Sequence, residues 1–331
     1  MCLACFAGHL SESLRLGFTA RVSIFHPPFV ILYLLRVQQW NNVTLVGVGL
    51  LGGSLGLALQ RHQLARQVVG LVRRRASLAE CAKLGVVHRA TLDPRRAVAD
   101  ADRVVLCTPL GRMREIFERM LTALKPGAVV TDVGSVKGSV VRELEPRVAA
   151  AGGHFVGSHP MAGAEKTGPG AARADLFAKA ICVVTPTRRT SAQAVQRVEA
   201  LWRAVGGIPL RLDPDQHDEL VSRSSHLPHV VAAALAQAVL DPAYPREQAQ
   251  LCATGFRDAT RIASSSPEMW RDIALANAAN LSRALGAFIA DLQRFRRALK
   301  AGDVEAIQRF FEQAKERRDA WCGTSASLSP E

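Results

Sequence analysis

A glycine-rich turn between a strand-like and a helix-like segment constrains this chain more than any other feature. The stretch NNVTLVGVGLLGGSLGLALQRHQ begins with a β-branched run and passes through Gly47, Gly49 and Gly52 into an Ala/Leu-rich helical pattern. Glycine permits a tight turn at the first position, close approach of a phosphate at the second and close helix–strand packing at the third. The pattern therefore predicts a dinucleotide-binding unit, with the phosphates held by the backbone at the helix start, at Gly49, Leu50 and Leu51.

The next expected strand, QVVGLVRRR at residues 67–75, indicates which dinucleotide is bound. A chain that selects NAD usually ends this strand with an acidic residue, which binds the ribose 2′-hydroxyl. Arginines stand here instead, and a guanidinium binds a 2′-phosphate through paired, charged hydrogen bonds. We therefore predict NADP as the cofactor, with NAD less favoured, and Arg73 and Arg74 as ligands of its 2′-phosphate. The alternative is that these arginines only form the solvated start of a helix.

Strand-like and helical segments continue to alternate after this unit. Strands are expected at 103–110, 128–138, 153–160 and 180–186, and helices at 111–124, 137–150 and 190–204. This alternation predicts an α/β fold, a Rossmann-type doubly wound sheet, parallel or mixed, that is covered on both faces. Ligands bind beyond the carboxyl ends of such strands. Thr108, Pro109, Ser135 and His159 are expected there, the first two at the cofactor.

The stretch GSHPMAGAEKTG, residues 157–168, is rich in glycine and is predicted to be a loop rather than a strand or a helix. It carries His159, whose imidazole can take a proton from an alcohol near neutral pH. We predict His159 as a general base and Ser135 as a hydrogen-bond partner of the reacting hydroxyl. An alternative role for Ser135 is the N-cap of the helix at 137–150.

The second half of the chain is predicted to be helical. Strand-like segments stop after residues 208–214, and helix start signals follow at Asp213-Pro214 and Ser266-Pro267. From the latter we predict one helix of about 34 residues, roughly 50 Å long, with a seam of apolar residues at spacings of three and four. The seam consists of Leu281, Leu285, Phe288, Leu292, Phe295 and Leu299.

One small domain hardly covers so long an apolar seam. The pattern therefore predicts a homodimer that forms through the helical domain. The alternative is packing of the seam against helices of the same chain, such as 228–240 and 303–318.

Three residues of the helical half are candidate substrate contacts. Arg261 offers a planar fork that suits a carboxylate. His217 and His229 are plausible substrate contacts, and the alternative is that both are satisfied core histidines.

The net charge of +13 does not indicate nucleic-acid binding. Of the 42 basic residues only seven are lysine, an arginine bias that often reflects the coding sequence. No basic block with interleaved aromatic residues occurs. An anionic small molecule is the partner that fits this charge.

The cysteines and the N-terminal stretch indicate in which cellular compartment the protein is expected. The seven cysteines are odd in number and widely spaced, which favours a reducing cytoplasm over a disulfide framework. Cys2 and Cys5 lack the further ligands of a zinc site, so we predict no metal. The apolar run at 29–35 is too short to span a membrane, and residues 1–40 are predicted to be a disordered or non-native extension.

Five motifs, in order, closely resemble the prephenate/arogenate dehydrogenase family of tyrosine biosynthesis. They are GVGLLGGSLG, TDVGSVKG, GSHPMAGAEKTG, HDELVSRSSHLPH and GFRDATRIASSSPEMWRDI. The resemblance implies a nucleotide-binding domain followed by a helical dimerisation domain. The expected boundaries are 41–212 for the Rossmann-type domain, 213–320 for the helical substrate domain and 321–331 for a tail.

The resemblance also implies roles for individual residues. His159 would be the base on the ring hydroxyl, Ser135 would bind that hydroxyl and orient His159, and Arg261 would bind the ring carboxylate. Other residues would shape the pocket or its entrance, partly across the dimer: His217, His229, Trp270, Glu165, Thr254 and Gly255.

The activity that the family implies is oxidative decarboxylation of prephenate to 4-hydroxyphenylpyruvate, with hydride transfer to NADP or NAD. The close alternative is an arogenate or dual-specificity cyclohexadienyl dehydrogenase, which would form tyrosine directly. More remote alternatives are a 3-hydroxyacid or imine-reducing dehydrogenase and a non-catalytic NADPH sensor. Residues 214–299 contain no lysine, which counts against the hydroxyacid class, because that class normally uses a catalytic lysine there.

Overall fold

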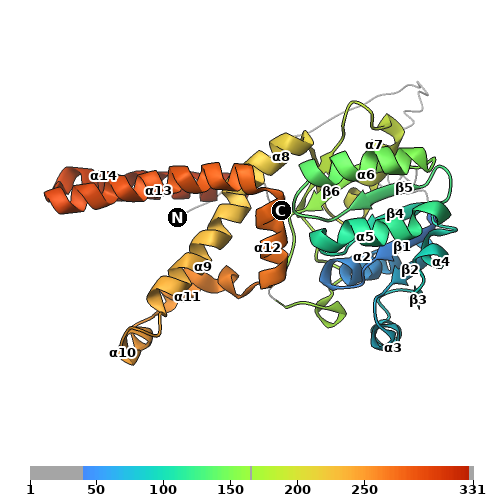
Figure 1. Cartoon of the computed structure of the whole chain (residues 1–331), viewed down its shortest axis with the longest axis horizontal. Coiled ribbons are helices and arrows are strands. Elements are labelled where there is room, and N and C mark those ends of the chain that lie inside the picture. Colours follow the sequence, from blue (N-terminus) through green and yellow to red (C-terminus); the bar gives the residue numbers. More distant parts are fainter. Residues whose placement is uncertain (1–39, 165, 328–331) are drawn as a thin grey trace, which may run out of the picture. The chain divides into compact units, whose positions relative to one another are not determined.

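The first half of the chain forms an eight-stranded sheet of order β3-β2-β1-β4-β5-β6-β7-β8 (Figure 1). The computed structural model describes residues 40–164 and 166–327. All neighbouring strands pair in parallel except β6 and β7, which are antiparallel, so the sheet is mixed. The strands are β1 (Trp40–Val46), β2 (Ala65–Leu71), β3 (Arg89–Thr91), β4 (Arg103–Leu106), β5 (Val129–Asp132), β6 (His154–Pro160), β7 (Ile181–Thr185) and β8 (Ile208–Arg211).

Helices cover both faces of this sheet, as the alternating sequence pattern predicts. Residues of α2 (Leu50–Arg61), α3 (Arg75–Leu84) and α7 (Ala192–Ala204) belong to the apolar cluster on one face. Residues of α4 (Pro94–Val98), α5 (Leu110–Met120) and α6 (Gly138–Ala150) belong to the cluster on the other. The Rossmann-type, doubly wound architecture is confirmed. The short strand β3 escaped prediction, since three residues carry too little pattern to recognise.

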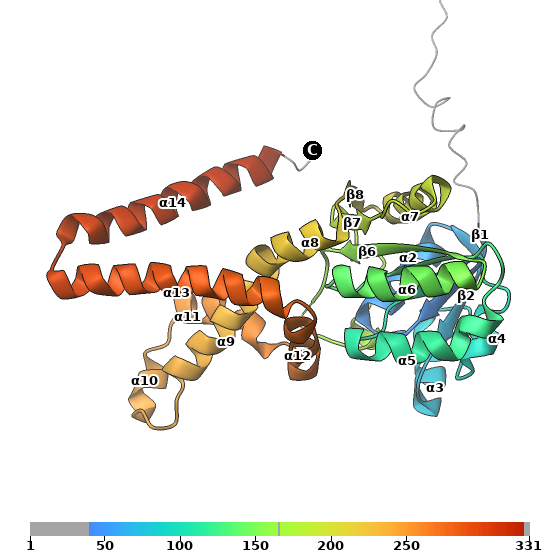
Figure 2. The ribbon, with the colours of Figure 1, turned by 45° about the horizontal axis from the view of Figure 1, so that its top comes forward.

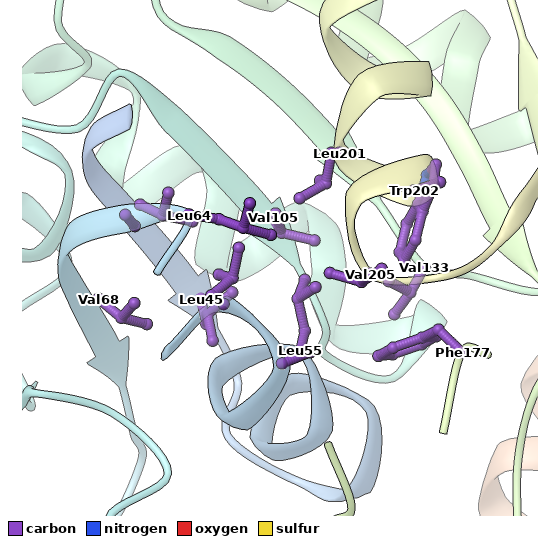
Figure 3. Packing of buried hydrophobic residues seen from close by; sticks show 14 of the residues in the cluster. Leu45, Leu55, Leu64, Val68, Val105, Val133, Phe177, Leu201, Trp202 and Val205 are labelled. Atoms are coloured by element: carbon purple, nitrogen blue, oxygen red, sulfur yellow. The ribbon is translucent and has the colours of Figure 1, made fainter. Parts of the chain in front are cut away.

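The core beside α2 and α7 combines residues far apart in the sequence (Figure 3). Leu45 of β1 and Leu55 of α2 are fully buried there. Trp202 of α7 packs against Phe177 with ring centroids 5.4 Å apart. Burying each such side chain contributes about 1.5–3 kcal/mol. This packing holds the glycine turn between β1 and α2 in a fixed place on the sheet.

The second half of the chain is helical, and both predicted start signals are confirmed. Asp213 caps α8 by accepting bonds from two backbone amides, and Ser266 caps α12 by accepting one from Met269. The elements are α8 (Pro214–Val221), a π-helical turn η3 (Ser222–His226), α9 (Leu227–Val239), α10 (Arg246–Gln250), α11 (Thr254–Thr260), the 3₁₀ turn η4 (Arg261–Ser264), α12 (Pro267–Ala276), α13 (Ala278–Ala301) and α14 (Val304–Ser327).

The prediction of one helix of about 34 residues is wrong. The chain turns at Asn277, and α12 and α13 meet at 95°. The Asn277 side chain is buried and donates hydrogen bonds to the Asp218 carbonyl (2.8 Å) and to a ring nitrogen of His226 (3.2 Å). These bonds tie the bend to α8 and η3, and helix periodicity does not reveal them. The whole apolar seam therefore lies on α13.

Helix α14 turns back beside the C-terminal part of α13 and diverges from it toward its own C-terminus (Figure 2). Phe295 of α13 contacts Phe310 of α14, with ring centroids 4.6 Å apart. The apolar seam of α13 is therefore covered in part by a helix of the same chain, which is the alternative to the homodimer. Apolar side chains of both helices nevertheless remain exposed: Leu299 of α13 is 53% exposed and Phe311 of α14 is 59% exposed.

The predicted end segments fit the structure only in part. β1 begins at Trp40, one residue inside the predicted extension at 1–40, and residues 1–39 lie outside the described residues. α14 continues to Ser327, so the predicted tail at 321–331 is helical over the residues that the structure describes. No single described helix is long and apolar enough to cross a membrane. Helices α12 and α13 have the length and composition of a membrane-spanning segment only when the two are taken together across their bend.

The helical half meets the sheet half at the first turns of α5 and α6, and all the described residues belong to one compact unit. A Cβ added at Gly111 would lie 2.3 Å from a carboxylate oxygen of Asp272 on α12. A Cβ added at Gly138 would lie 2.9 Å from a carboxylate oxygen of Asp218 on α8. Glycine at both positions therefore favours this close approach, which brings helical-half residues to the carboxyl edge of the sheet.

Candidate active site

The three glycines of the turn have the geometry that a dinucleotide site requires. Gly47 has a φ of +97°, which favours glycine. A Cβ at Gly52 would lie only 2.1 Å from the Gly47 carbonyl oxygen, so helix and strand touch there. At Gly49, in contrast, nothing in the described chain lies within 4 Å of an added Cβ, which leaves room for a ligand.

The helix start beyond this turn is suited to a phosphate. Helix α2 begins at Leu50 with no side-chain cap in the described chain and no acidic residue in its first turn. The first amides of a helix have no intrahelical acceptor and carry a partial positive charge. The backbone at Gly49, Leu50 and Leu51 therefore fits the pyrophosphate of a dinucleotide, as the sequence predicts.

Two further predicted cofactor contacts lie at neighbouring strand ends. Thr108 follows β4, and its hydroxyl is buried with no hydrogen-bond partner among the described residues. Pro109 is the N-cap of α5. Arg73 and Arg74 are exposed between β2 and α3, with Arg74 as the N-cap of α3. An unpartnered buried hydroxyl at this edge fits a polar ligand group.

His159 lies in the last part of β6, one residue before the strand ends. The predicted strand at 153–160 is confirmed as β6, and the overlapping prediction that residues 157–168 form a loop is wrong for the first four, which pair antiparallel with β7. The strand pairing holds the backbone of His159 opposite Val183. The side chain is buried, and its Nδ1 lies 2.9 Å from Nε2 of His217. A base in a paired strand is held more rigidly than a base in a loop.

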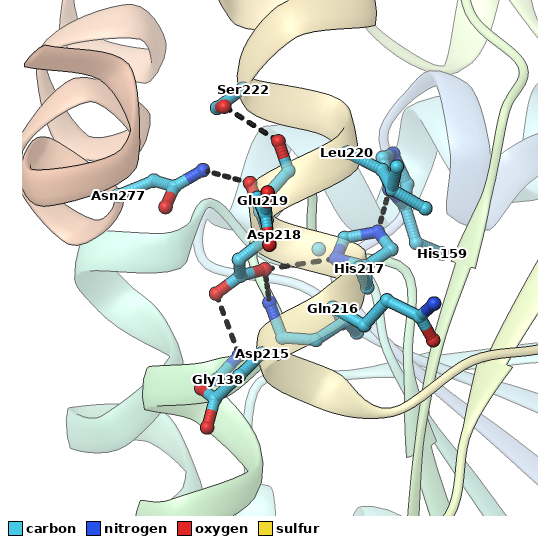
Figure 4. Close-up of polar contacts among 12 residues, drawn as sticks. Gly138, His159, Asp215, Gln216, His217, Asp218, Glu219, Leu220, Ser222 and Asn277 are labelled. Atoms are coloured by element: carbon cyan, nitrogen blue, oxygen red, sulfur yellow. Dashed lines mark hydrogen bonds and ion pairs between the residues drawn. The ribbon is translucent and has the colours of Figure 1, made fainter. Parts of the chain in front are cut away.

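His217 connects His159 to Asp218 (Figure 4). It is fully buried, and its Nδ1 lies 2.9 Å from Oδ1 of Asp218. The same oxygen accepts the Lys137 amide at 2.7 Å, and Oδ2 accepts the Gly138 amide at 2.8 Å. Asp218 thus caps α6, the role considered for Ser135. His217 lies behind His159, and its predicted substrate contact stays a prediction.

A buried ion pair lies beside the two histidines. The Lys137 ammonium contacts the Asp132 carboxylate at the end of β5, and both side chains are fully buried. The ammonium also donates to the Ser158 carbonyl at 2.8 Å, and the Ser158 amide donates to Asp132 at 3.0 Å. Burial lowers the pKa of Lys137, and Asp132 opposes that shift. The pair ties β5 to the strand that carries His159.

Burial keeps the imidazoles of this site neutral. It lowers the pKa of His159 well below its usual value, and the nearby His217, Lys137 and His226 lower it further. Burial also lowers the pKa of His217, against the hydrogen bond that it donates to Asp218, which raises it. A neutral imidazole has a free lone pair, so His159 is able to accept a proton at neutral pH.

A second cluster of aromatic residues joins this network through His226. The indole of Trp270 on α12 stacks on His229 of α9, with ring centroids 3.8 Å apart, and meets His226 edge-on at 5.9 Å. The charge of Arg261 lowers the pKa of His229, after the larger effect of burial. Burial lowers the pKa of His226 to about 4, and the charge of Asp218 opposes this shift more than the Ser135 backbone does. Predicted residues from both halves of the chain therefore gather around His226.

Other predicted substrate residues are placed less firmly. Thr254 and Gly255 begin α11 and are exposed. Glu165 lies outside the described residues. Neither the contact of Arg261 with a carboxylate nor that of Ser135 with a hydroxyl is tested by the structure.

The site includes residues that the sequence prediction did not assign to it. Asp132, Lys137, Asp218, His226 and Asn277 are all buried there. Their signal was weak: charged residues follow strands or histidines in many proteins, and only packing of α8 against α6 shows which ones meet. Among the described residues no group of three or more His, Cys, Asp or Glu is placed to hold a metal ion, and Cys2 and Cys5 lie outside them.

A glycine turn for a dinucleotide, a neutral buried imidazole at the same sheet edge and a helical half that closes over it define an NAD(P)-dependent dehydrogenase. Residues 55–209 match the family model "Prephenate dehydrogenase, nucleotide-binding domain", and residues 213–313 match "Prephenate dehydrogenase, dimerization domain". The chain belongs to the prephenate dehydrogenase family.

Individual relatives agree with this assignment. The chain is 34% identical over 285 residues to the prephenate dehydrogenase of Bacillus subtilis, covering 85% of this chain and 76% of the relative. It is also 34% identical to the cyclohexadienyl dehydrogenase of Zymomonas mobilis, covering 84% and 95%. The crystal structure of Aquifex aeolicus prephenate dehydrogenase with hydroxyphenyl propionate and NAD⁺ matches with a TM-score of 0.79 and 32% identity, over 85% of this chain and 99% of that one.

The glycine geometry gives a test of the cofactor site. We expect Gly52→Ala to lower both thermal stability and dinucleotide affinity, because its Cβ would collide with the Gly47 carbonyl oxygen at 2.1 Å. Gly49→Ala is the matched variant, since its Cβ meets nothing within 4 Å in the described chain. It should keep the melting temperature and lose dinucleotide affinity, measured by fluorescence titration. Equal dinucleotide affinity in Gly49→Ala and wild type would contradict the placement of the phosphates.

Proposed function

We propose that this protein is a prephenate dehydrogenase that converts prephenate to 4-hydroxyphenylpyruvate and carbon dioxide and reduces NADP. The observation that carries the proposal is the neutral, buried His159, hydrogen-bonded to His217 at 2.9 Å beside the dinucleotide edge. Membership of the family supports the substrate class. The matched relatives include a prephenate and a cyclohexadienyl dehydrogenase.

In the proposed reaction a bound nicotinamide would supply the hydride acceptor for the ring carbon that bears the hydroxyl. His159 accepts the hydroxyl proton, with Ser135 hydrogen-bonded to the same oxygen. Arg261 binds the ring carboxylate through its planar guanidinium fork, and the stacked His229 and Trp270 shape the pocket around it. Loss of carbon dioxide makes the ring aromatic and the reaction effectively irreversible. The residues therefore need only to align the reacting groups and keep water out.

A spectrophotometric assay that crosses prephenate and arogenate with NADP and NAD tests this function. We expect reduction of NADP with prephenate. Turnover of arogenate alone would make the protein an arogenate dehydrogenase, and turnover of both would make it a cyclohexadienyl dehydrogenase. His159→Asn should bind the dinucleotide normally and lose about 10²–10⁴-fold in kcat, the usual contribution of a general base. Failure of the wild-type protein to turn over any of the four pairs would refute the proposal.

The preference for NADP follows from the arginines after β2. Arg73 and Arg74 are exposed there, and the strand end offers no carboxylate to a ribose hydroxyl. An exposed guanidinium can pair with a 2′-phosphate without first breaking an ion pair within the protein. The related Aquifex structure contains NAD⁺, so the arginines carry this part of the proposal alone.

Replacement of both arginines by serine tests this preference. We expect the Arg73→Ser/Arg74→Ser variant to raise the KM for NADP by about 10–100-fold, since a hydrogen bond to a charged group contributes about 1.5–3 kcal/mol. Its KM for NAD should stay within about threefold. Arg75→Ser, at the exposed first residue of α3, is the control and should change neither value much. Unchanged NADP kinetics in the double variant would leave the arginines as a solvated helix start.

We also infer that the chain forms a homodimer through its helical half. The match of residues 213–313 to the family's dimerization domain supports this, as do the bare apolar side chains of α13 and α14. Sedimentation of the full chain should give twice its mass of 35.7 kDa at micromolar concentration. Replacing exposed Leu299 and Phe311 by glutamate should give the single-chain mass. A wild-type protein that sediments as a monomer would contradict the inference.

A further inference from the structure

We propose that Asp218 is a positioning residue for the proton acceptor: through His217 it fixes the tautomer of His159, and it balances the charge of the proton that His159 takes up. The proposal rests on the proposed role of His159 as the base. Asp218 itself lies two hydrogen bonds away from His159 and three from the reacting hydroxyl, so its effect reaches the reaction only through the two imidazoles.

The donors and acceptors along the network determine the tautomers of His217 and His159. An ionised carboxylate only accepts hydrogen bonds. Nδ1 of His217 lies 2.9 Å from Oδ1 of Asp218 and must therefore carry the proton of that ring. Nε2 of His217 is then an acceptor, and His159 must donate to it from Nδ1 across 2.9 Å. The lone pair of His159 is left on Nε2, and this nitrogen is the proton acceptor.

Two backbone amides hold the Asp218 carboxylate in one orientation. Lys137 N–H donates to Oδ1 at 2.7 Å and Gly138 N–H donates to Oδ2 at 2.8 Å. These amides form the start of α6, where the helix dipole stabilises a negative charge. No side chain of α6 itself caps this end in the described structure. The carboxylate is thus fixed from the sheet half, although it belongs to the helical half.

The charges around His159 explain why a carboxylate is needed. In the described chain the charged and titratable groups of this network are Asp132, Lys137, Asp218, His217 and His226. Asp132 and Lys137 form an ion pair whose charges cancel wherever its proton lies. The Asp218 carboxylate is then the one negative charge of the network that no other group balances. When the substrate O–H bond breaks and the proton bonds to Nε2 of His159, the imidazole pair gains one positive charge, and the buried network becomes neutral.

An asparagine at this position would not reproduce these bonds. With its oxygen toward His217 and the Lys137 amide, its NH₂ group would face the Gly138 amide, so two donors would meet. With the amide flipped, the NH₂ group would face Lys137 N–H and would force Nδ1 of His217 to become an acceptor. His159 would then receive a hydrogen bond on Nδ1 and carry its proton on Nε2, which is the wrong tautomer for a base.

Kinetics of Asp218→Asn in the full chain test the proposal. We expect kcat to fall about 10²–10³-fold, in the range that a misoriented general base costs, with KM for substrate and cofactor within about threefold. The acid limb of the pH profile of kcat/KM should move to lower pH, because loss of the negative charge disfavours the protonated imidazole pair. A merely structural defect would lower the active fraction without moving that limb.

Asp215→Asn is the matched control. Asp215 lies on the same helix, three residues earlier, and forms an exposed ion pair with Arg142 of α6 at 2.6 Å. This variant removes a carboxylate from the same helix junction and should keep kcat within about twofold. An Asp218→Asn variant with the kcat and acid limb of the wild type would overturn the inference while leaving the proposed function intact. A wild-type protein without turnover would instead refute the proposed function.

A measurement on the wild-type protein covers the case in which Asp218→Asn does not fold. The ¹⁵N chemical shifts of the His159 ring, assigned by comparison with His159→Asn, report its tautomer directly. We expect Nδ1 to carry the proton and Nε2 to be unprotonated at neutral pH. A ring protonated on Nε2 would overturn the inference without any kinetic measurement.

Discussion

The hydrogen bonds between the Asp218 carboxylate and the first amides of α6 are the contact on which the site depends. They join a residue of α8 to a helix start about 80 positions earlier in the chain. A carboxylate at a helix start is stabilised by unsatisfied amides and by the helix dipole. Gly138 favours the contact, since a Cβ there would lie only 2.9 Å from a carboxylate oxygen of Asp218. His217, the next residue, is thereby brought against His159.

Three buried charged side chains meet in this region of the fold. Lys137, Asp132 and Asp218 are each at least 95% buried, and burying single charges would cost several kcal/mol per ion without partners. Each charge here has a partner: the lysine and Asp132 contact each other, and Asp218 receives two amides and an imidazole. Apolar residues of the same volume would pack at least as well. The retained polar network therefore points to a role in holding the imidazoles, which an apolar core would leave free to rotate.

The sequence predicted some of these features and missed others for identifiable reasons. The glycine turn, the helix caps at Asp213 and Ser266 and the alternation of strands and helices depend on neighbours in the chain, and the structure confirms them. The straight helix through residue 277 was predicted from periodicity alone and is wrong, because Asn277 bonds to Asp218 and His226 across the fold. His159 was predicted as a general base from its side chain, but its rigid position depends on the pairing of its strand with β7.

The sequence by itself determined the class of the fold and the dinucleotide turn, and it supplied the candidate residues for accepting a proton or binding a carboxylate. These follow from local conformational preferences and from side-chain chemistry, which need no distant partner. Only the tertiary structure decided which histidine lies beside which. It placed His217 behind His159 and joined both to Asp218, because that order depends on how α8 docks on α6. Docking is set by the summed packing of both halves of the chain, and no local stretch of sequence encodes that sum.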